Sequence, residues 1–473
     1  MIINIYCTNY SLNQGGGNVQ EYLRQLKIYI KDIAKLALPI TTAFVAMGLM
    51  GIIDTMIVGN YNTDQLAYIG LANSIFVVLF TIPIGLLQGV LIKSSQKFGA
   101  HKFQSTGKIY NEGRKYSFIL AIVFTLLGIQ GETILRLLGQ DDDMVKHGGE
   151  VLRVFVFSIP FILMYVNANF FLQSIRRPYV GMYGIIAANI LNIIVNPVLV
   201  YGKFGFPELG AVGSATSTLI VRIFLAVYIL AYIRRMKKNP KLNKRFGLDR
   251  SYSTWWNDSR RTRKIGYGIA IMTIATNGSF SIVSTFAGWM GQHTMATFVI
   301  MINVSTLLFM ICFSISQATS IVVANAYGRG DRKGILMATN AGYVISLTTI
   351  ITLITILYSY PDQVFGIFTN DPSVISVIKG LLFFVLADLF IDALPLNING
   401  ALNGRGDVKI PTLNQVISFL GVRVSACYFF AFTLDMGLKG LPIGLACGGL
   451  SSLILNTLRF GYLAHRDKKE GLH

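Results

Sequence analysis

The stretch QGVLIKSSQKFG (residues 88–99) closes a long apolar segment and runs into a basic loop, and a related stretch occurs again later in the chain. The second copy is QATSIVVANAYG (317–328), at an offset of 229 in the numbering. NANFFLQ (167–173) and NINGALN (397–403) are related in the same way, at an offset of 230. Because nearly the same offset recurs at separate places, we infer an internal duplication and expect both halves to share one fold.

The sequence around these copies is strongly apolar. Of the 473 residues, 53% are hydrophobic and only 13% are charged, whereas soluble domains carry about 25% charged residues. Apolar segments long enough for transmembrane helices are expected at about 33–58, 66–92, 115–131, 151–174, 179–201, 209–233, 265–289, 294–325, 338–360, 376–402, 411–433 and 440–464. We therefore predict an all-α polytopic membrane protein with twelve transmembrane helices in two pseudo-symmetric six-helix lobes.

Lysine and arginine alternate between the loops that join these segments. The loop 93–115 and the central segment 234–264 are basic, whereas the loops near residues 60 and 291 have no basic residue. Basic loops stay in the cytoplasm, so both termini are predicted to be cytoplasmic in a bacterial-type inner membrane. The net charge of +19 is then explained by topology and lipid contact, and nucleic acid is not an expected partner.

The repeat and the loops together predict five parts of the chain. These are a cytoplasmic N-terminal tail with an interfacial helix (1–32), an N-lobe (33–233), a basic cytoplasmic linker (234–264), a C-lobe (265–464) and a cytoplasmic C-terminal tail (465–473). Each half starts on the same side of the membrane, so the repeat is parallel. Parallel repeats of this kind occur in transporters that alternate access to a path between two bundles.

Asp54 is the first of several ionisable residues inside the apolar segments. A carboxylate in hydrocarbon costs about 2.5–3.5 kcal/mol, and the second half has no acid at the corresponding position. Asn189, Asn192 and Asn196 share one face of the predicted fifth span and offer amide partners. Asp54 is therefore interpreted as a proton or cation site. The alternative is an acid that reaches the outer interface from near the helix end.

A second group of charges lies in the later spans. Asp388 and Asp392 are four residues apart on one helix face, and because like charges repel, one of them should be protonated or paired. If the following turn centres near residue 405, Asp388 and Arg423 lie at similar depth. We expect these two to pair, which leaves Asp392 free to titrate or to meet a cationic substrate. Arg222 has no partner that the sequence indicates.

The sequence indicates no catalytic chemistry. The five histidines are scattered, and no zinc-binding, nucleophile or phosphate-binding motif is present. The four cysteines have no metal-ligand spacing. We expect a non-enzymatic monomer without a cofactor. In the absence of a nucleotide site, transport would draw on a gradient of H⁺ or Na⁺.

The chain resembles the MATE (multidrug and toxic compound extrusion) family of secondary transporters over about residues 30–465. The stretch LNIIVNPVLVYGKFGFPELGAVGSATST (191–218) is the most specific part of this resemblance, and DALPLNINGALNGRGD (392–407) is its counterpart in the second half. The resemblance implies a fold of two six-helix lobes. It also implies cation-coupled export of organic, often cationic, compounds.

The resemblance also assigns roles in the first half. Asp54 matches the span 1 carboxylate that is implicated in proton or sodium coupling. Asn192, Asn196 and Thr218 match the polar partners of that carboxylate. Pro39 matches a proline at which span 1 bends in some members of the family.

In the second half the resemblance is less complete. Asp392 matches a carboxylate of the bacterial multidrug branch. Many members place a glutamate in span 7, where this chain has Thr276 and Asn277. A sodium site that depends on that glutamate is therefore in doubt. The candidate substrate or ion site of the C-lobe comprises Asp388, Asp392, Arg423 and Asn277.

We therefore predict a secondary antiporter that exports organic compounds, cationic or amphipathic, in exchange for H⁺ or Na⁺ at Asp54. Proton coupling is favoured, because one carboxylate among amides offers few hard oxygen ligands for Na⁺. One alternative is a flippase for lipid-linked oligosaccharide from the same superfamily, which requires a cationic cavity; Arg222 and Arg423 are the candidates. The other alternative is a non-transporting membrane scaffold.

Overall fold

The computed structural model describes residues 17–137, 139–249, 255–366 and 372–469, so parts of both predicted tails and of the predicted linker lie outside the described residues. The regular elements in these ranges are all helices. Ten continuous helical stretches, some of them made of two or more of these elements, are long and apolar enough to cross a membrane, or eleven if the bent pair α4 (Phe103–Ile129) and α5 (Gly131–Leu137) forms one span. The remaining predicted span, 376–402, lies within the 34-residue helix α16.

The chain forms two compact units, Thr42–Thr273 and the combination of Met1–Thr41 with Ile274–His473. We call them the N-terminal and C-terminal units. Their boundaries fall inside α2 (Gly17–Gly59) and α12 (Arg260–Trp289). The boundary between the two units therefore lies within two long helices. The basic segment 234–264, which the sequence predicts as a linker, belongs to the N-terminal unit.

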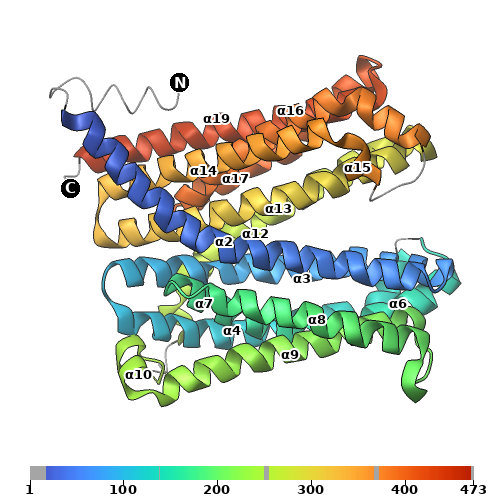
Figure 1. Ribbon diagram of the computed structural model, residues 1–473, viewed down its shortest axis with the longest axis horizontal. Helices are drawn as coiled ribbons and strands as arrows, with labels where there is room; N and C mark the ends of the chain where they lie inside the picture. Colours follow the sequence, from blue (N-terminus) through green and yellow to red (C-terminus); the bar gives the residue numbers. More distant parts are fainter. Residues whose placement is uncertain (1–16, 138, 250–254, 367–371, 470–473) are drawn as a thin grey trace. The chain divides into compact units, whose positions relative to one another are not determined.

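In the N-terminal unit, α8 packs along α9, and α4 packs along α3 and α7 (Figure 1). The elements that lie wholly in this unit are α3 (Thr63–Gly99), α4 (Phe103–Ile129), α5 (Gly131–Leu137), α6 (Asp142–Phe157), α7 (Ile159–Ser174), α8 (Tyr179–Tyr201), η1 (Lys203–Gly205), α9 (Gly210–Lys238), α10 (Pro240–Phe246) and α11 (Trp255–Asp258).

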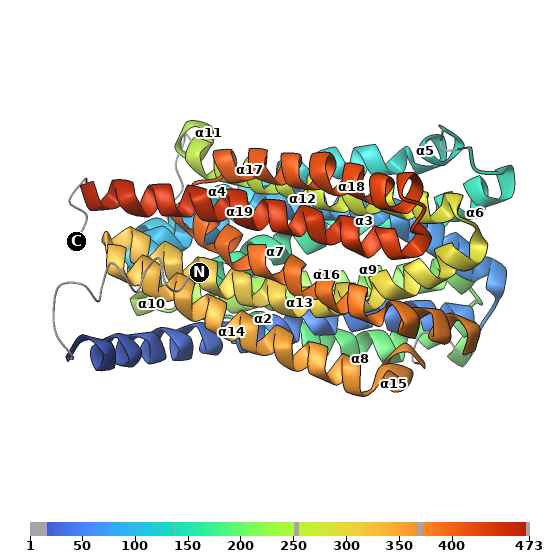
Figure 2. The same cartoon turned by 90° about the horizontal axis from the view of Figure 1, so that it is seen from above.

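In the C-terminal unit, α13 packs along α14 and α16, and α16 packs along α19 (Figure 2). Its elements are α13 (Gln292–Arg329), α14 (Arg332–Ser359), α15 (Pro361–Gly366), α16 (Pro372–Arg405), α17 (Lys409–Val416), η2 (Ile417–Arg423), α18 (Val424–Tyr428), η3 (Phe429–Thr433), η4 (Gly437–Lys439) and α19 (Gly440–Lys469). α17, η2, α18 and η3 follow one another without a break, and η2 and η3 are π-helical.

The helix boundaries repeat along the chain at the offset that the sequence motifs predict. The starts of α3 and α13 differ by an offset of 229, and their ends differ by 230. The starts of α5 and α15, of α6 and α16, of α8 and α17, and of α9 and α19 all differ by an offset of 230. The predicted duplication is therefore confirmed at the level of helices. Its clearest exception is α8, an uninterrupted α-helix whose counterpart contains the two π-helical segments.

Side-chain caps explain where several helices begin. Asn62 caps α3 by accepting a hydrogen bond from the backbone N–H of Asp64 at 2.7 Å. Asp141 caps α6, and Asp331 caps α14. Such caps satisfy backbone N–H groups that have no partner within the helix. Local sequence therefore sets these helix starts.

The segment that follows α9 is packed onto the N-terminal unit. A Cβ atom added to Gly107 of α4 would overlap the carbonyl oxygen of Phe246 in α10. Asn111, one turn further along α4, donates from Nδ2 to the carbonyl oxygen of Leu248 at 3.0 Å. A glycine is needed at 107 because the two backbones come so close together.

Candidate functional site

Asp54 lies in the part of α2 that belongs to the N-terminal unit, and its side chain is buried, with 8% exposure. Asn192 and Asn196 of α8 both donate from Nδ2 to Asp54 Oδ1, at 3.0 and 2.5 Å. Thr218 of α9 donates from Oγ1 to Asp54 Oδ2 at 3.1 Å. The structure thus brings all four residues predicted for ion coupling into one site.

Helical spacing explains which asparagines reach the carboxylate. Asn192 and Asn196 are one turn apart on α8 and point the same way. Asn189, which the sequence places on the same face, donates instead to the carbonyl oxygen of Ile185 at 3.0 Å in its own helix. The site therefore uses two of the three amides, and α9, packed along α8, supplies the third donor.

The site surrounds one carboxylate with three neutral hydrogen-bond donors. Donors of this kind stabilise the ionised form of a buried acid without a neighbouring metal ion. The amide oxygens of Asn192 and Asn196 are buried and have no hydrogen-bond partner among the described residues. If the two amides rotated, these oxygens and the carboxylate would face a cation. The same residues therefore offer a proton acceptor as they stand and a set of oxygen ligands after rearrangement.

Arg222, for which the sequence indicates no partner, lies one helical turn from Thr218 on α9. Its guanidinium group stacks over Phe76 at 4.5 Å and lies 5.4 Å from the ring centre of Phe80. It also donates a hydrogen bond to Ser158 Oγ, at the junction of α6 and α7. Aromatic faces and a hydroxyl hold this charge. Within the described part of the chain Arg222 makes no direct ion pair with Asp54, but the two charges act on each other electrostatically.

In the C-terminal unit, Arg423 pairs with Asp392 and not with Asp388, so the predicted pairing is wrong. Arg423 Nη2 donates to the two carboxylate oxygens of Asp392 at 2.6 and 2.7 Å. The arginine is fully buried, and its guanidinium group lies 3.9 Å from the ring centre of Phe419.

The error comes from the assumed position of the turn. α16 ends at Arg405 and α17 begins at Lys409, so the turn centres on residue 407 and not on 405. When the centre of the turn moves by two residues, the residue of α16 that lies opposite Arg423 changes by four positions, which is one helical turn. Asp392, one turn beyond Asp388, therefore lies opposite Arg423.

The remaining predicted residues lie apart from this pair. The side chain of Asn277 on α12 is exposed, whereas its neighbour Thr276 accepts a hydrogen bond from Gln415 Nε2 at 3.4 Å. Pro39 lies within α2, which continues through it as one helix of 43 residues. A bend at Pro39 stays a prediction.

A polar network in the C-terminal unit was missed by the sequence reasoning. Asn456 of α19 donates to Asn399 Oδ1 of α16 at 2.7 Å, and Asn414 of α17 donates to Asn456 Oδ1 at 2.9 Å. Ser452 extends the network to Gln415. The asparagines of NINGALN (397–403) could have indicated this network, because polar amide side chains inside a predicted span need hydrogen-bond partners.

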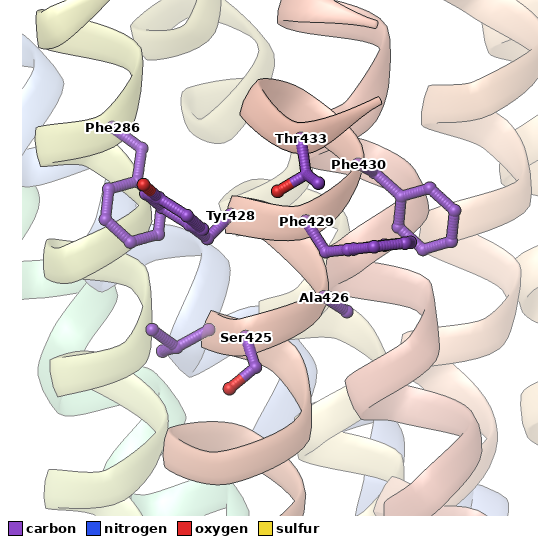
Figure 3. Close-up of a pocket in the computed structure, with 8 residues that line it drawn as sticks. Phe286, Ser425, Ala426, Tyr428, Phe429, Phe430 and Thr433 are labelled. Atoms are coloured by element: carbon purple, nitrogen blue, oxygen red, sulfur yellow. The ribbon is translucent and has the colours of Figure 1, made fainter. Parts of the chain in front are cut away.

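A shallow aromatic groove of about 690 Å³ lies beside η3 in the same unit (Figure 3). Figure 3 shows the ring of Phe286 next to that of Tyr428, and their centres are 5.8 Å apart. The lining residues are Phe286, Val424, Ser425, Ala426, Tyr428, Phe429, Phe430 and Thr433. None of them is charged, so the groove would contact a ligand through apolar and aromatic surface.

Comparison with known proteins gives the family. The sequence model of the MatE family matches residues 39–198 and 269–429, once in each half. The chain is 30% identical over 446 residues to the probable multidrug resistance protein NorM of Caulobacter vibrioides, a match that covers 93% of this chain and 92% of the relative. It is 25% identical to the multidrug resistance protein NorM of Vibrio cholerae, with 95% and 99% of the two chains covered.

Solved structures agree with this relationship at the level of the fold. A crystal structure of a eukaryotic MATE transporter matches with a TM-score of 0.84 at 20% identity, and covers 94% of this chain and 99% of that chain. An outward-facing multidrug resistance MATE transporter of the MOP superfamily matches with a TM-score of 0.83 at 18% identity, over 93% and 97% of the two chains. The family match in both halves, the related sequences and the shared fold together place this chain in the MATE family of membrane transporters.

Proposed function

We propose that this protein is a secondary active exporter of organic compounds that exchanges its substrate for a cation bound at Asp54. The observation that carries the proposal is the buried carboxylate itself, held by donors from two other helices in the N-terminal unit. An ionisable group in a membrane span is costly and points to a role in ion or substrate movement. Multidrug export is further supported by the names of the related NorM proteins.

Protonation of Asp54 would change the hydrogen bonds around it. The ionised carboxylate accepts from Asn192, Asn196 and Thr218, but a protonated acid carries an O–H that is itself a donor. With the proton on Oδ1, which accepts from both amides, at least one amide would have to rotate or move away. With the proton on Oδ2, the Thr218 hydroxyl would turn to accept it. Either change alters a hydrogen bond from α2 to α8 or α9, so we expect ion binding at Asp54 to affect the packing of these helices. A ligand shifts such an equilibrium by the difference in its affinity for the two states.

The proton is the better candidate for the coupling ion. Hard metal cations such as Ca²⁺ and Mg²⁺ take about six or more oxygen ligands, whereas Asp54 and Thr218 present three oxygens without rearrangement. A proton needs only one of the carboxylate oxygens. Sodium coupling would require both asparagine amides to turn their oxygens inward.

The substrate we propose is an organic cation or amphipathic compound, exported from the cytoplasm of a bacterial cell across its inner membrane. A compound of this kind is attracted to aromatic faces by stacking and cation–π contact. The aromatic groove of the C-terminal unit offers such faces, with Phe286, Tyr428 and Phe429 among its lining residues.

Replacement of Asp54 tests the proposal. We expect Asp54→Asn to abolish gradient-driven efflux of a fluorescent cationic dye from cells, because the amide cannot take up a proton. Asp142→Asn is the matched control, since Asp142 is an exposed acid in the first turn of α6, and it should export the dye at the unmodified rate. Efflux that persists in membrane-inserted Asp54→Asn protein would remove Asp54 from the mechanism.

Reconstituted protein distinguishes the coupling ions. In proteoliposomes we expect addition of the dye to produce a pH change across the membrane that Asp54→Asn eliminates. Radioactive Na⁺ flux should stay at the level of empty liposomes. Dye-driven Na⁺ flux without proton movement would assign sodium as the coupling ion.

A further inference from the structure

The second cluster of buried charges is in the C-terminal unit and is not used by the proposed mechanism. Asp388 is only 7% exposed, and its Oδ1 atom is buried without a hydrogen-bond partner in the described part of the chain. Asp392, one turn further along α16, accepts two hydrogen bonds from Arg423. Nε and Nη1 of Arg423 are also buried and find no partner among the described residues. The cluster thus contains two carboxylates, one guanidinium and unused donors and acceptors.

Two glycines of α19 make room for this cluster. A Cβ atom on Gly448 would lie 2.8 Å from Arg423 Nε, and one on Gly449 would overlap Asp392 Oδ1. At the offset of 230 that relates the starts of α9 and α19, Gly448 corresponds to Thr218, the threonine that contacts Asp54 in the N-terminal unit. At this position the first half has a threonine whose hydroxyl contacts Asp54. The second half has a glycine, which leaves room for the side chain of Arg423.

The charges of the cluster do not balance. With both carboxylates and the guanidinium group ionised, the cluster has a net charge of −1 in a buried environment. Asp392 is already neutralised by Arg423, so the excess charge falls on Asp388. A buried carboxylate with an unpartnered oxygen must be compensated by a proton or by another cation.

We propose that Arg423 is a built-in cation for the carboxylates of the C-terminal unit, so that this unit takes up one proton, at Asp388, and no metal ion. The guanidinium group occupies both oxygens of Asp392, and Phe419 and Phe280 lie 3.9 and 4.9 Å from it. A metal ion would therefore find only Asp388 free. One carboxylate is too few oxygens for a hard cation, whereas a proton needs no further ligand.

Two groups act on Asp388 electrostatically, Asp392 on its own helix and Arg423 on η2. Asp388 itself acts on Cys427 of α18. Cys447 on α19 acts in turn on Cys427. Of the two groups that act on Asp388, Arg423 carries the positive charge.

Removal of the built-in cation should create a metal site. We would measure radioactive Na⁺ binding to purified protein in the Asp54→Asn background, which lacks the N-terminal site. We expect this background to bind no Na⁺. Adding Arg423→Gln should leave two buried carboxylates that bind Na⁺ at least tenfold above background, and a further Asp388→Asn change should abolish that binding. Na⁺ binding in Asp54→Asn alone that Asp388→Asn removes would overturn the proposal, as would a monodisperse Arg423→Gln protein that binds no Na⁺.

Arg423→Gln strands two buried acids and can prevent folding, so a second measurement uses the unaltered chain. Hydrophobic carbodiimides react with protonated carboxyl groups, and mass spectrometry locates the modified residue. We expect modification at Asp388 and not at Asp392, falling at least tenfold from acidic to alkaline pH and unaffected by Na⁺. Modification at Asp392 instead, its absence from Asp388 at acidic pH, or protection of Asp388 by Na⁺ would overturn the proposal.

The physiological meaning of this second proton site rests on the proposed ion-coupled export, but its test does not. Carbodiimide modification of Asp388 should persist in Asp54→Asn protein, whether or not that variant exports dye. If dye efflux survives in Asp54→Asn while Asp388 is modified as expected, the role of Asp54 fails and the C-terminal proton site stands. If efflux is lost and Asp388 is not modified, the reverse holds.

Discussion

At the scale of single residues, the two units hold a buried carboxylate in different ways. Asp54 is surrounded by three neutral donors, whereas Asp392 faces a guanidinium group. The neutral donors do not cancel the charge of an ionised Asp54. The arginine neutralises Asp392 permanently, because a guanidinium group does not deprotonate in proteins. Residue type alone therefore does not reveal how a buried acid is held.

Glycine substitutions in α19 should distinguish tight from open positions. We expect Gly448→Ala to lower the stability by about 1–3 kcal/mol, the usual effect of overpacking, because its Cβ would approach Arg423 to 2.8 Å or less. Gly461→Ala on the same helix meets no described atom within 4 Å and should stabilise it by up to about 1 kcal/mol through helix propensity. Thermal unfolding in detergent checks both, and equal effects would contradict the packing around Arg423.

At the scale of helices, the motif GRGD (404–407) joins α16 to α19. Arg405 pairs with Asp467 at 2.5 Å, and both side chains are almost fully buried. Asp407 accepts from Arg459 at 2.8 and 3.2 Å. The arginine and the aspartate of the motif thus each have a partner of opposite charge on α19, so the motif is structural.

The buried pair should matter far more than an exposed one. Removal of one partner by Arg405→Gln leaves Asp467 buried and uncompensated, which costs about 3–5 kcal/mol in comparable pairs. We expect the double variant Arg405→Gln with Asp467→Asn to lose less than the sum of the single losses. Asp362→Asn breaks the exposed pair with Lys379 on the same α16 and should cost about 0–1 kcal/mol. Thermal unfolding of the four variants measures the coupling, and additive losses would argue against a buried pair.

At the scale of the whole molecule, duplication determines the architecture and divergence determines the sites. Helix starts recur at an offset of 229 or 230, yet Asp54, Arg222, Asp388, Asp392 and Arg423 have no charged counterpart at that offset. The apolar pattern needed for packing in a membrane was retained in both halves. Each of these charges is present in one half only, so the duplicated fold does not require it in both.

The close contact between α4 and α10, in the segment after α9, can be tested by substitution at Gly107. Gly107→Ala should displace α10 from α4, because the new Cβ overlaps a backbone carbonyl oxygen that has no side chain to rotate. Overpacking of about 1–3 kcal/mol would raise tryptic cleavage at Lys241, Lys244 and Arg245 about tenfold, since cleavage follows the population of the open form. Gly70→Ala, with no described atom within 4 Å, should leave the cleavage rate unchanged, and a rise in both variants would count against this docking.

Much of the molecule follows from the sequence alone, because its signals are local or periodic. Apolar length predicts the spans, a constant offset predicts the duplication, and helical spacing places Asn192 and Asn196 on one face. These features depend on the rise and period of a helix, which neighbours barely alter. The site at Asp54 was predictable for this reason together with the family resemblance.

Tertiary structure decided the partners across helices. Arg423 meets Asp392 because the turn between α16 and α17 centres two residues later than the sequence suggests. Arg222 stacks on Phe76 and donates to Ser158, contacts between distant segments that no spacing rule indicates. A shift of one helical turn replaces one carboxylate by the next, so the choice between Asp388 and Asp392 depends on packing geometry that sequence periodicity does not contain.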